Sequence, residues 1–215
     1  MKEQRGAKLV ATPEGLTLTD GELSARGDFS RLVPRIRRGN LKTELIVRAV
    51  RIKGVSEPYV VDATAGLGED SFLLAAAGCR VLLFERDPVI ADLLSDALDR
   101  AASDPETSVA ASRMTLVRGD SIPSLPSLDP SPDVVLLDPM FPERTKSALV
   151  KKKFQLIHQL EKPCDDERAL LDAAIAANPR RIVVKRPAKG PFLAGVAPSF
   201  TLAGKAVRYD VYQLS

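Results

Sequence analysis

Two patterns of apolar residues alternate along the chain from residue 59 to the C-terminus. Short runs rich in valine and leucine, such as residues 59–61 and 134–137, are typical of strands that are buried on both faces of a sheet. Between them, apolar residues recur at the three- and four-residue spacing of an amphipathic helix. Strands are predicted at residues 59–61, 81–84, 114–117, 134–137 and 182–184, helices at residues 71–77, 88–102, 148–160 and 167–177, and a final hairpin at residues 200–202 and 207–212.

This alternation predicts an α/β, Rossmann-like fold, in which a mostly parallel sheet is covered by helices on both faces. In such sheets, ligands bind beyond the carboxyl ends of the strands. The first four predicted strands each end at or near an acidic residue. Asp62, Glu85, Asp120 and Asp138 are therefore expected to lie along one edge of the sheet.

The first 55 residues follow a different pattern. Residues 9–12 and 16–19 are short β-prone runs on either side of a Pro-Glu-Gly turn, which predicts a small hairpin. Residues 35–40 are basic and contain a glycine, so a loop is expected there. Apolar residues at helical spacing then predict a helix over residues 41–52.

The composition is that of a globular protein, because 45% of the 215 residues are hydrophobic and 27% are charged. No apolar run approaches the roughly 20 residues of a membrane helix, and no signal-peptide core follows the polar N-terminus. We therefore expect a soluble, cytoplasmic protein. The two cysteines lie far apart and there is one histidine, so no disulfide framework, metal site or serine–histidine triad is expected.

The formal net charge is only +3, but the basic residues are clustered. Such clusters suit contact with a polyanion such as RNA, although an ordinary solvated surface has the same composition. The candidate RNA-binding residues are Arg35, Arg37, Arg38, Lys151, Lys152, Lys153, Lys185 and Arg186.

A glycine-containing segment, Asp62-Ala-Thr-Ala-Gly-Leu-Gly-Glu-Asp70, follows the first predicted strand of the α/β region and leads into a helix. Gly66 and Gly68 allow a tight turn and a close approach to a ligand. The segment lacks the Gly-Lys-Ser/Thr of a phosphate-binding loop and the third glycine of a dinucleotide fingerprint. Its acidic residues, which include Glu69, would repel a pyrophosphate but suit a cationic ligand such as S-adenosylmethionine.

Two further strand ends offer contacts to an adenosyl group. Glu85 follows the glycine turn by about twenty residues, where a carboxylate can accept hydrogen bonds from both ribose hydroxyls. Dinucleotide enzymes and methyltransferases share this feature, so it does not separate them. Asp120 and Ser121, after the third strand, are candidates to hold the adenine amino group.

One segment separates dinucleotide enzymes from methyltransferases. It is Asp138-Pro139-Met140-Phe141-Pro142, which follows the fourth strand. The exocyclic amine of a base is a poor nucleophile, because its lone pair is delocalised into the ring. Acceptors at Asp138 and at the Pro139 carbonyl would hold both amine hydrogens, and Phe141 would stack on the flipped-out base. A turn with a packed Phe141 is the structural alternative. We expect a catalytic contribution from orientation and electrostatics rather than from a strong base.

Five segments together resemble a known family. They are the glycine turn, Glu85-Arg86, the Asp-Pro-Met-Phe-Pro string, Lys-Ser-Ala-Leu-Val-Lys-Lys at residues 146–152 and Val-Lys-Arg-Pro at residues 184–187. They are similar to the bacterial ribosomal RNA small subunit methyltransferase J family, whose members methylate N2 of a guanine in 16S ribosomal RNA. The resemblance runs from about residue 59 to the C-terminus. The glycine turn is generic, whereas the two longer strings are specific to the family.

The resemblance implies a class I methyltransferase with a seven-stranded sheet whose last strand is antiparallel, and S-adenosylmethionine as its cofactor. Residues 56–215 would form the methyltransferase domain and residues 1–55 an N-terminal extension. The implied cofactor contacts are Glu69, Asp70, Glu85, Arg86, Asp120, Ser121 and Asp138, to which the glycine turn adds Asp62 and Gly66. The family usually has arginine at the position of Glu69 and often Ser-Ser at that of Asp120-Ser121.

Other functions remain open at this point. The same chemistry suits an adenine in DNA, a protein side chain or a small amine. An RNA-binding module without a working cofactor site is a second alternative, although the intact acidic edge argues against it. A nicotinamide-dependent dehydrogenase is a remote one. The expected partner is 16S ribosomal RNA or the small ribosomal subunit.

Overall fold

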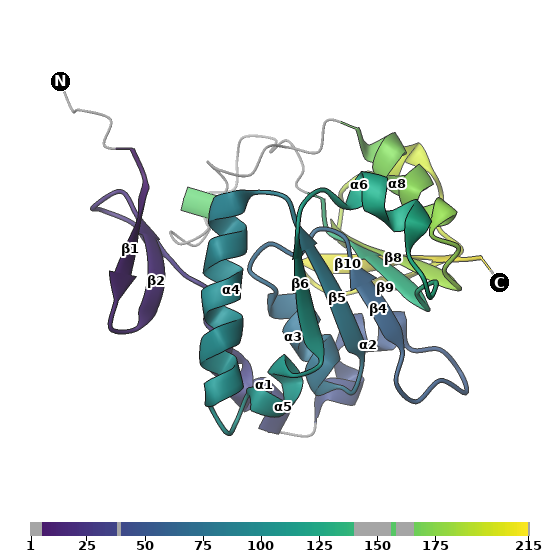
Figure 1. Cartoon of the computed structure of the whole chain (residues 1–215). Coiled ribbons are helices and arrows are strands. Elements are labelled where there is room, and N and C mark those ends of the chain that lie inside the picture. Colours follow the sequence, from purple (N-terminus) through teal and green to yellow (C-terminus); the bar gives the residue numbers. More distant parts are fainter. Residues whose placement is uncertain (1–5, 38–39, 140–155, 158–165, 215) are drawn as a thin grey trace.

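The computed structural model describes residues 6–37, 40–139, 156–157 and 166–214, and it confirms the predicted α/β architecture (Figure 1). Its main sheet has seven strands in the order β6-β5-β4-β7-β8-β10-β9. The strands from β6 to β8 are mutually parallel, whereas β10 runs antiparallel to both β8 and β9. The strands are β4 (Tyr59–Asp62), β5 (Arg80–Glu85), β6 (Met114–Arg118), β7 (Val134–Leu137), β8 (Arg181–Pro187), β9 (Phe200–Ala203) and β10 (Val207–Gln213).

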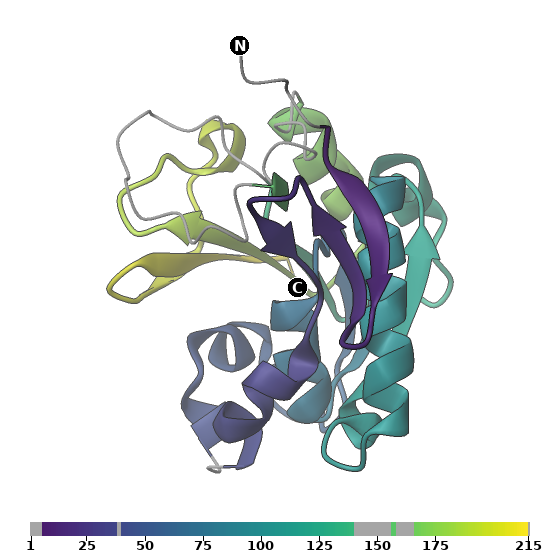
Figure 2. The same ribbon diagram turned by 90° about the vertical axis from the view of Figure 1, so that its left-hand side faces the viewer.

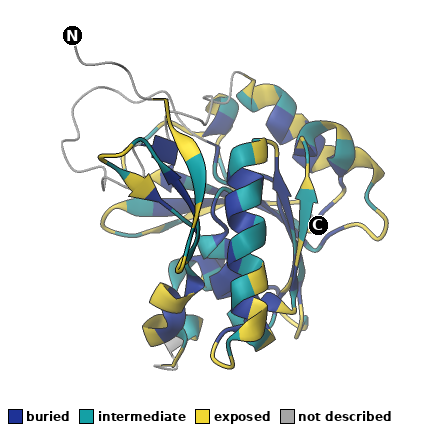
Figure 3. Cartoon of the chain, turned by 60° about the vertical axis from the view of Figure 1, so that its left-hand side comes forward, coloured by how far each residue is buried: buried dark blue, intermediate teal, exposed yellow. Residues whose placement is uncertain are grey.

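Both faces of this sheet are covered. Successive residues of β4 point to opposite sides, so Val60 packs in the core on one face and Val61 in the core on the other, and both are fully buried. In Figure 3 the central strands fall almost entirely in the buried class. The described helices that follow β4 are α3 (Glu69–Ala76), α4 (Pro88–Ser103), α5 (Ser108–Ala111), α6 (Ser121–Ser124) and α8 (Glu167–Ala176), with short 3-10 turns η3 (Leu125–Ser127) and η4 (Leu193–Gly195).

The N-terminal hairpin is confirmed as β1 (Lys8–Thr12) and β2 (Gly15–Thr19), and a short β3 (Ser24–Ala25) completes a small antiparallel sheet. Figure 2 shows this sheet lying along α4. Leu18 and Ala25 pack there against Ile90 and Leu93 of α4. Leu156 and Ile157 are buried in the same cluster, so the chain after β7 returns to the side of the hairpin.

Two local predictions in this region need correction. The loop expected over residues 35–40 is partly helical, because Arg35 and Arg37 lie in α1 (Val33–Arg37), which continues from η1 (Phe29–Leu32). The single helix expected over residues 41–52 is divided into η2 (Asn40–Thr43) and α2 (Leu45–Val50). Glu44 separates them, since its backbone is not helical (φ −60°, ψ 130°), and its carboxylate binds Arg35. The proposed division of the chain at residue 55 stays a prediction.

The ring of Phe29 stacks on Phe72 of α3, with ring centroids 4.7 Å apart and an angle of 7° between the ring planes. Both side chains are buried. We expect Phe29→Ala to lower the free energy of unfolding by about 3–5 kcal/mol, because it removes buried area and leaves a cavity. Urea unfolding would measure this, with Val109→Ala as a control because Val109 is 72% exposed. A Phe29→Ala variant as stable as that control would contradict the stacked contact.

Candidate active site at the carboxyl edge of the sheet

The predicted edge is real, because hydrogen bonds join the ends of four neighbouring strands. The turn after β4 is tied to β7 by Ala63 N–H to the Leu136 carbonyl (3.0 Å) and to β5 by Ala65 N–H to the Phe84 carbonyl (3.0 Å). The segment after β6 joins them when the Ser121 hydroxyl donates to the Ala63 carbonyl at 2.8 Å. Residues far apart in the sequence therefore meet at one edge.

Glycine is required in the turn between β4 and α3. Gly66 and Gly68 both have positive φ angles, +54° and +71°, which residues with a side chain rarely adopt. A Cβ atom on Gly68 would also lie only 2.8 Å from Cδ1 of Leu94. The turn then leads directly into α3, whose first turn carries Glu69 and Asp70. Acidic residues are favourable there because they face the positive end of the helix dipole.

Glu85 is buried at the end of β5 and holds the glycine turn in place. Its Oε2 accepts a hydrogen bond from Gly66 N–H at 2.8 Å, and its Oε1 accepts one from Asp87 N–H at 2.8 Å. Burial raises the pKa of Glu85, and these two hydrogen bonds oppose the rise. Each carboxylate oxygen has a further lone pair, so the group can still accept hydrogen bonds from two hydroxyls.

Asp62 has a bracing role in the structure. Its Oδ2 accepts a 2.6 Å hydrogen bond from the Ser71 hydroxyl of α3, and its Oδ1 accepts one from Thr64 N–H at 3.1 Å. Burial, together with the neighbouring charges of Asp70 and Asp138, raises the pKa of Asp62 to about 7, although the hydrogen bonds from Ser71 and Thr64 oppose the rise. Asp62 thus joins the end of β4 to the start of α3.

Asp138 follows β7 and lies beside the glycine turn, since its backbone N–H donates to the Thr64 hydroxyl at 2.6 Å. Its carboxylate Oδ2 is 2.9 Å from Nζ of Lys185, and the same Nζ is 2.8 Å from Oδ2 of Asp70. Desolvation raises the pKa of Asp138, although Lys185 opposes the rise. Burial alone would lower the pKa of Lys185, but Asp138 and Asp70 together raise it. Pro139, the next residue, is buried.

The remaining predicted cofactor contacts lie along the same edge. Asp120 is exposed and caps α6 by accepting from Ile122 N–H at 2.9 Å, whereas Ser121 is buried. Arg86 is exposed directly after Glu85, and Glu69 is half-buried at the start of α3. Met140, Phe141 and Pro142 lie outside the described residues.

The predicted RNA-binding residues are in different environments. Arg35 makes a bidentate ion pair with Glu44, at 2.9 and 2.7 Å, and Arg37 forms an ion pair with Glu106. Arg186 is 1% exposed and forms an ion pair with Glu167, so the expected phosphate contact of Arg186 does not fit its position. Neighbouring strand residues point to opposite faces, which is why Arg186 and Lys185 differ. Four further candidates lie outside the described residues: Arg38, Lys151, Lys152 and Lys153.

Sequence reasoning missed three polar side chains that organise the site: the Thr64 hydroxyl, the Ser71 hydroxyl and the Lys185 ammonium as a partner of two carboxylates. Lys185 follows the buried run of β8, so the rule of polar residues at strand ends pointed to it. Because Lys185 is positively charged, the sequence favoured a contact with an RNA phosphate over a contact with the carboxylates of the site. Ser71 lies in the first turn of α3, where the sequence offers no comparable signal.

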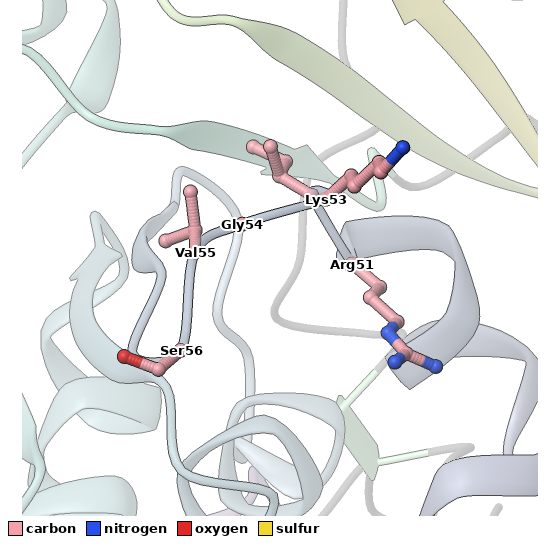
Figure 4. Close-up of a pocket in the computed structure, with 6 residues that line it drawn as sticks. Arg51, Lys53, Gly54, Val55 and Ser56 are labelled. Atoms are coloured by element: carbon pink, nitrogen blue, oxygen red, sulfur yellow. The ribbon is translucent and has the colours of Figure 1, made fainter.

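An open hollow of about 600 Å³ lies elsewhere on the surface (Figure 4). It belongs to the loop that precedes β4, at the amino end of the parallel strands and therefore opposite the acidic edge. We do not assign the active site to it. Its lining residues are Arg51, Ile52, Lys53, Gly54, Val55 and Ser56.

The strand order, the antiparallel last strand and the glycine turn held by an acidic residue define an S-adenosylmethionine-dependent methyltransferase fold and site. A model of the family described as "Putative SAM-dependent methyltransferase" matches residues 1–214. Ribosomal RNA small subunit methyltransferase J of Thioalkalivibrio sulfidiphilus is 46% identical over 220 residues, which cover 98% of this chain and 86% of that protein. The protein of the same name from Nitrosococcus oceani is 46% identical, with coverages of 95% and 83%.

A solved structure agrees with these relatives. The crystal structure of a SAM-dependent methyltransferase from Neisseria gonorrhoeae is 38% identical and superimposes with a TM-score of 0.79, covering 99% of this chain and 85% of that one. The chain therefore belongs to the ribosomal RNA small subunit methyltransferase J family of S-adenosylmethionine-dependent methyltransferases. Among the described residues, no helix is long and apolar enough to cross a membrane, and no group of three or more His, Cys, Asp and Glu side chains is placed to hold a metal ion.

The raised pKa of Asp62 has a consequence for stability. Between its ordinary value of 3.8 and about 7, the folded protein keeps a proton that the unfolded chain has released. The free energy of unfolding should therefore fall as the pH rises through this window, by at most about 1.4 kcal/mol per pH unit. Asn cannot titrate, so Asp62→Asn should show a shallower fall in the same window.

Urea unfolding of both proteins across this pH range would test the prediction. Asp99→Asn, a change at an exposed residue of α4, is the matched control and should keep the wild-type slope. Equal pH dependence in wild type and Asp62→Asn would show that the Asp62 carboxyl group is not the source.

Proposed function

We propose that the protein transfers a methyl group to the exocyclic N2 amine of a guanine in 16S ribosomal RNA. The single observation that carries the proposal is the position of Asp138 and Pro139. They follow β7 and are tied by the Thr64 hydroxyl to the glycine turn, so an acceptor for an amine lies directly beside the cofactor turn. The relatives named ribosomal RNA small subunit methyltransferase J support RNA as the substrate.

The donor groups at the edge fit S-adenosylmethionine, which supplies a methyl group bound to a positively charged sulfur. Glu85 is fixed by two backbone N–H groups and accepts from the ribose hydroxyls. Gly66 gives the backbone of the turn a close approach to the ligand. The acidic surroundings of Asp70 and Asp138 favour its positive charges. Further contacts that we propose are those of Asp62, Glu69, Arg86, Asp120 and Ser121.

The chain's part in the reaction is mainly orientation. The Asp138 carboxylate and the Pro139 carbonyl accept the two hydrogens of the amine, which directs the nitrogen lone pair at the methyl carbon. The bound cofactor would supply the methyl group, with its C–S bond breaking to leave neutral S-adenosylhomocysteine as the C–N bond forms. The positive charge would pass to the nitrogen, where the Asp138 carboxylate would stabilise it until one amine hydrogen leaves as a proton to solvent. The stacking of Phe141 on the flipped-out base belongs to the same proposal.

Arg35 and Arg37 are the described candidates for contact with the RNA backbone, since their side chains are 46% and 64% exposed. An exposed ion pair contributes only about 0–1 kcal/mol, so a phosphate can replace the glutamate partner at little cost. We propose that Arg38 and the three lysines at residues 151–153 add to this surface. Ribosomal RNA or the small subunit is then the partner, in the cytoplasm.

Glu85→Gln should weaken S-adenosylmethionine binding by at least about 10-fold, because a hydrogen bond to a charged group contributes roughly 1.5–3 kcal/mol. The amide also places an NH2 group against one of the two backbone N–H donors that now meet the carboxylate. Calorimetry with S-adenosylmethionine and S-adenosylhomocysteine would measure the change. Asp99→Asn serves as the control. Unchanged affinity in a folded Glu85→Gln variant would remove Glu85 from the cofactor site.

The activity itself is tested with labelled cofactor and small-subunit RNA or subunits that lack the methyl group. We expect incorporation by the wild type, located by mass mapping on N2 of a guanine. Asp138→Asn should lower the rate by about 100-fold, as expected for loss of a positioned electrostatic contact. Its affinity for the cofactor should change much less.

Two results would contradict the proposal. The first is absence of incorporation into every ribosomal substrate. The second is a methyl group mapped to another amine, which would keep the chemistry but change the substrate. Asp99→Asn should behave as the wild type throughout.

A further inference from the structure

The geometry points to Lys185 as a positioning residue for methyl transfer, which fixes the Asp138 carboxylate by bridging it to Asp70 on α3. This inference rests on the proposed function, in which Asp138 receives the amine. It replaces the sequence-based expectation that Lys185 contacts an RNA phosphate.

The register of the sheet explains why Lys185 reaches Asp138. Leu137 of β7 pairs with Val184 of β8 in a parallel ladder, so the next residues of the two chains, Asp138 and Lys185, are neighbours at the carboxyl edge. Tyr209 of β10 lies opposite Lys185 on the other side of β8. The lysine is thus placed between two strands by main-chain pairing, and its position does not depend on a surface loop.

The bridge joins the two halves of the site. Nζ of Lys185 is 2.9 Å from Oδ2 of Asp138 and 2.8 Å from Oδ2 of Asp70, and only 26% of the lysine side chain is exposed. Asp70 belongs to the first turn of the helix that follows the glycine turn. One ammonium therefore links the cofactor turn to the residue that holds the amine. Because the lysine engages Oδ2, the contact orients the carboxylate and assigns Oδ1 to the substrate.

The charges around this bridge make the lysine important for the protonation of Asp138. The titratable and charged groups near the cluster are Asp62 on β4, Asp70 on α3, Tyr209 on β10 and Arg35 on α1, and the charge of Arg186 acts on Asp138 from the other face of β8. Of the two arginines, one is engaged by Glu167 and the other by Glu44. Without Lys185, carboxylates would face each other with no cation between them. The pKa of Asp138, already raised by desolvation, would then rise further.

A protonated Asp138 would have one acceptor oxygen fewer and no negative charge for the developing cation. The variants that test this are Lys185→Met, which removes the charge, and Lys185→Arg, which keeps it. Lys53→Met removes the same charge from an exposed position at the opposite edge of the sheet and is the matched control.

We expect Lys185→Met to lower kcat at pH 7 by about 10-fold or more and to move the acidic limb of the pH–rate profile upward by about one pH unit. Part of the lost rate should return at high pH. Lys185→Arg should recover most of the rate and the wild-type limb. In both Lys185 variants, the KM for RNA and the salt dependence of that KM should stay at the wild-type values, as in Lys53→Met.

A second measurement needs no substrate. Carboxylate carbon NMR of the cofactor-free protein, with the Asp138 signal assigned by Asp138→Asn, should show a higher pKa for Asp138 in Lys185→Met than in the wild type. An unchanged Asp138 titration overturns the inference even if guanine methylation is demonstrated. Conversely, a wild type inactive on 16S RNA overturns the proposed function while this titration still reports on Lys185.

Two kinetic outcomes also overturn the inference. If Lys185→Met weakens RNA binding and reduces the salt dependence by about one phosphate contact, with kcat and the pH profile unchanged, Lys185 is a phosphate ligand. If Lys185→Arg is as impaired as Lys185→Met, with a lowered free energy of unfolding and an unshifted pH profile, Lys185 has only a structural role.

Discussion

The hydrogen bonds between the turn after β4 and the ends of β5 and β7 hold the whole site together. Backbone groups at the end of a buried strand lose water on folding and must find other partners. Here Ala63 and Ala65 satisfy them by bonding across to Leu136 and Phe84. The turn can make these bonds only if it folds back on itself, which the positive φ angles of Gly66 and Gly68 allow. The hydrogen bonds that satisfy the backbone groups at the strand ends therefore also set the geometry of the ligand edge.

The same edge concentrates negative charge. Four carboxylates lie around one turn: Asp62, Asp70, Glu85 and Asp138. Burial raises the pKa of Asp62, Glu85 and Asp138. Burying carboxylates without partners is unfavourable, so each of the four is given donors: hydroxyl and backbone N–H groups for Asp62, backbone N–H groups for Glu85, and Lys185 for the other two. A cationic ligand would relieve the remaining repulsion. The same four carboxylates thus affect the stability of the fold and favour a positively charged cofactor.

The sequence was sufficient for the sheet and for much of its ligand edge, because both follow from local patterns. Runs such as residues 134–137 are apolar enough to identify buried strands, and parallel strands carry their polar ends to one side. Contacts that depend on register were not accessible in this way. Nothing in the residues near Lys185 indicates that Asp138 is its neighbour, since that follows from the pairing of Leu137 with Val184. The break at Glu44 was equally hidden, because the helical spacing of apolar residues continues across it.

The adjacent pair Lys185 and Arg186 shows why clusters of basic residues are ambiguous evidence for RNA binding. The two residues point to opposite faces of β8, and each is used by a carboxylate of the fold: Glu167 for the arginine, Asp70 and Asp138 for the lysine. Their ion pairs are partly or fully buried, so exchanging a carboxylate for a phosphate would leave a charge uncompensated. Arg35 and Arg37 differ because their guanidinium-bearing side chains are themselves exposed, so their ion pairs are more easily exchanged. Exposure of the basic side chain itself, which rises from 0% in Arg186 and 26% in Lys185 to 46% in Arg35 and 64% in Arg37, therefore decides, more than the density of positive charge, which basic residues are available to the RNA.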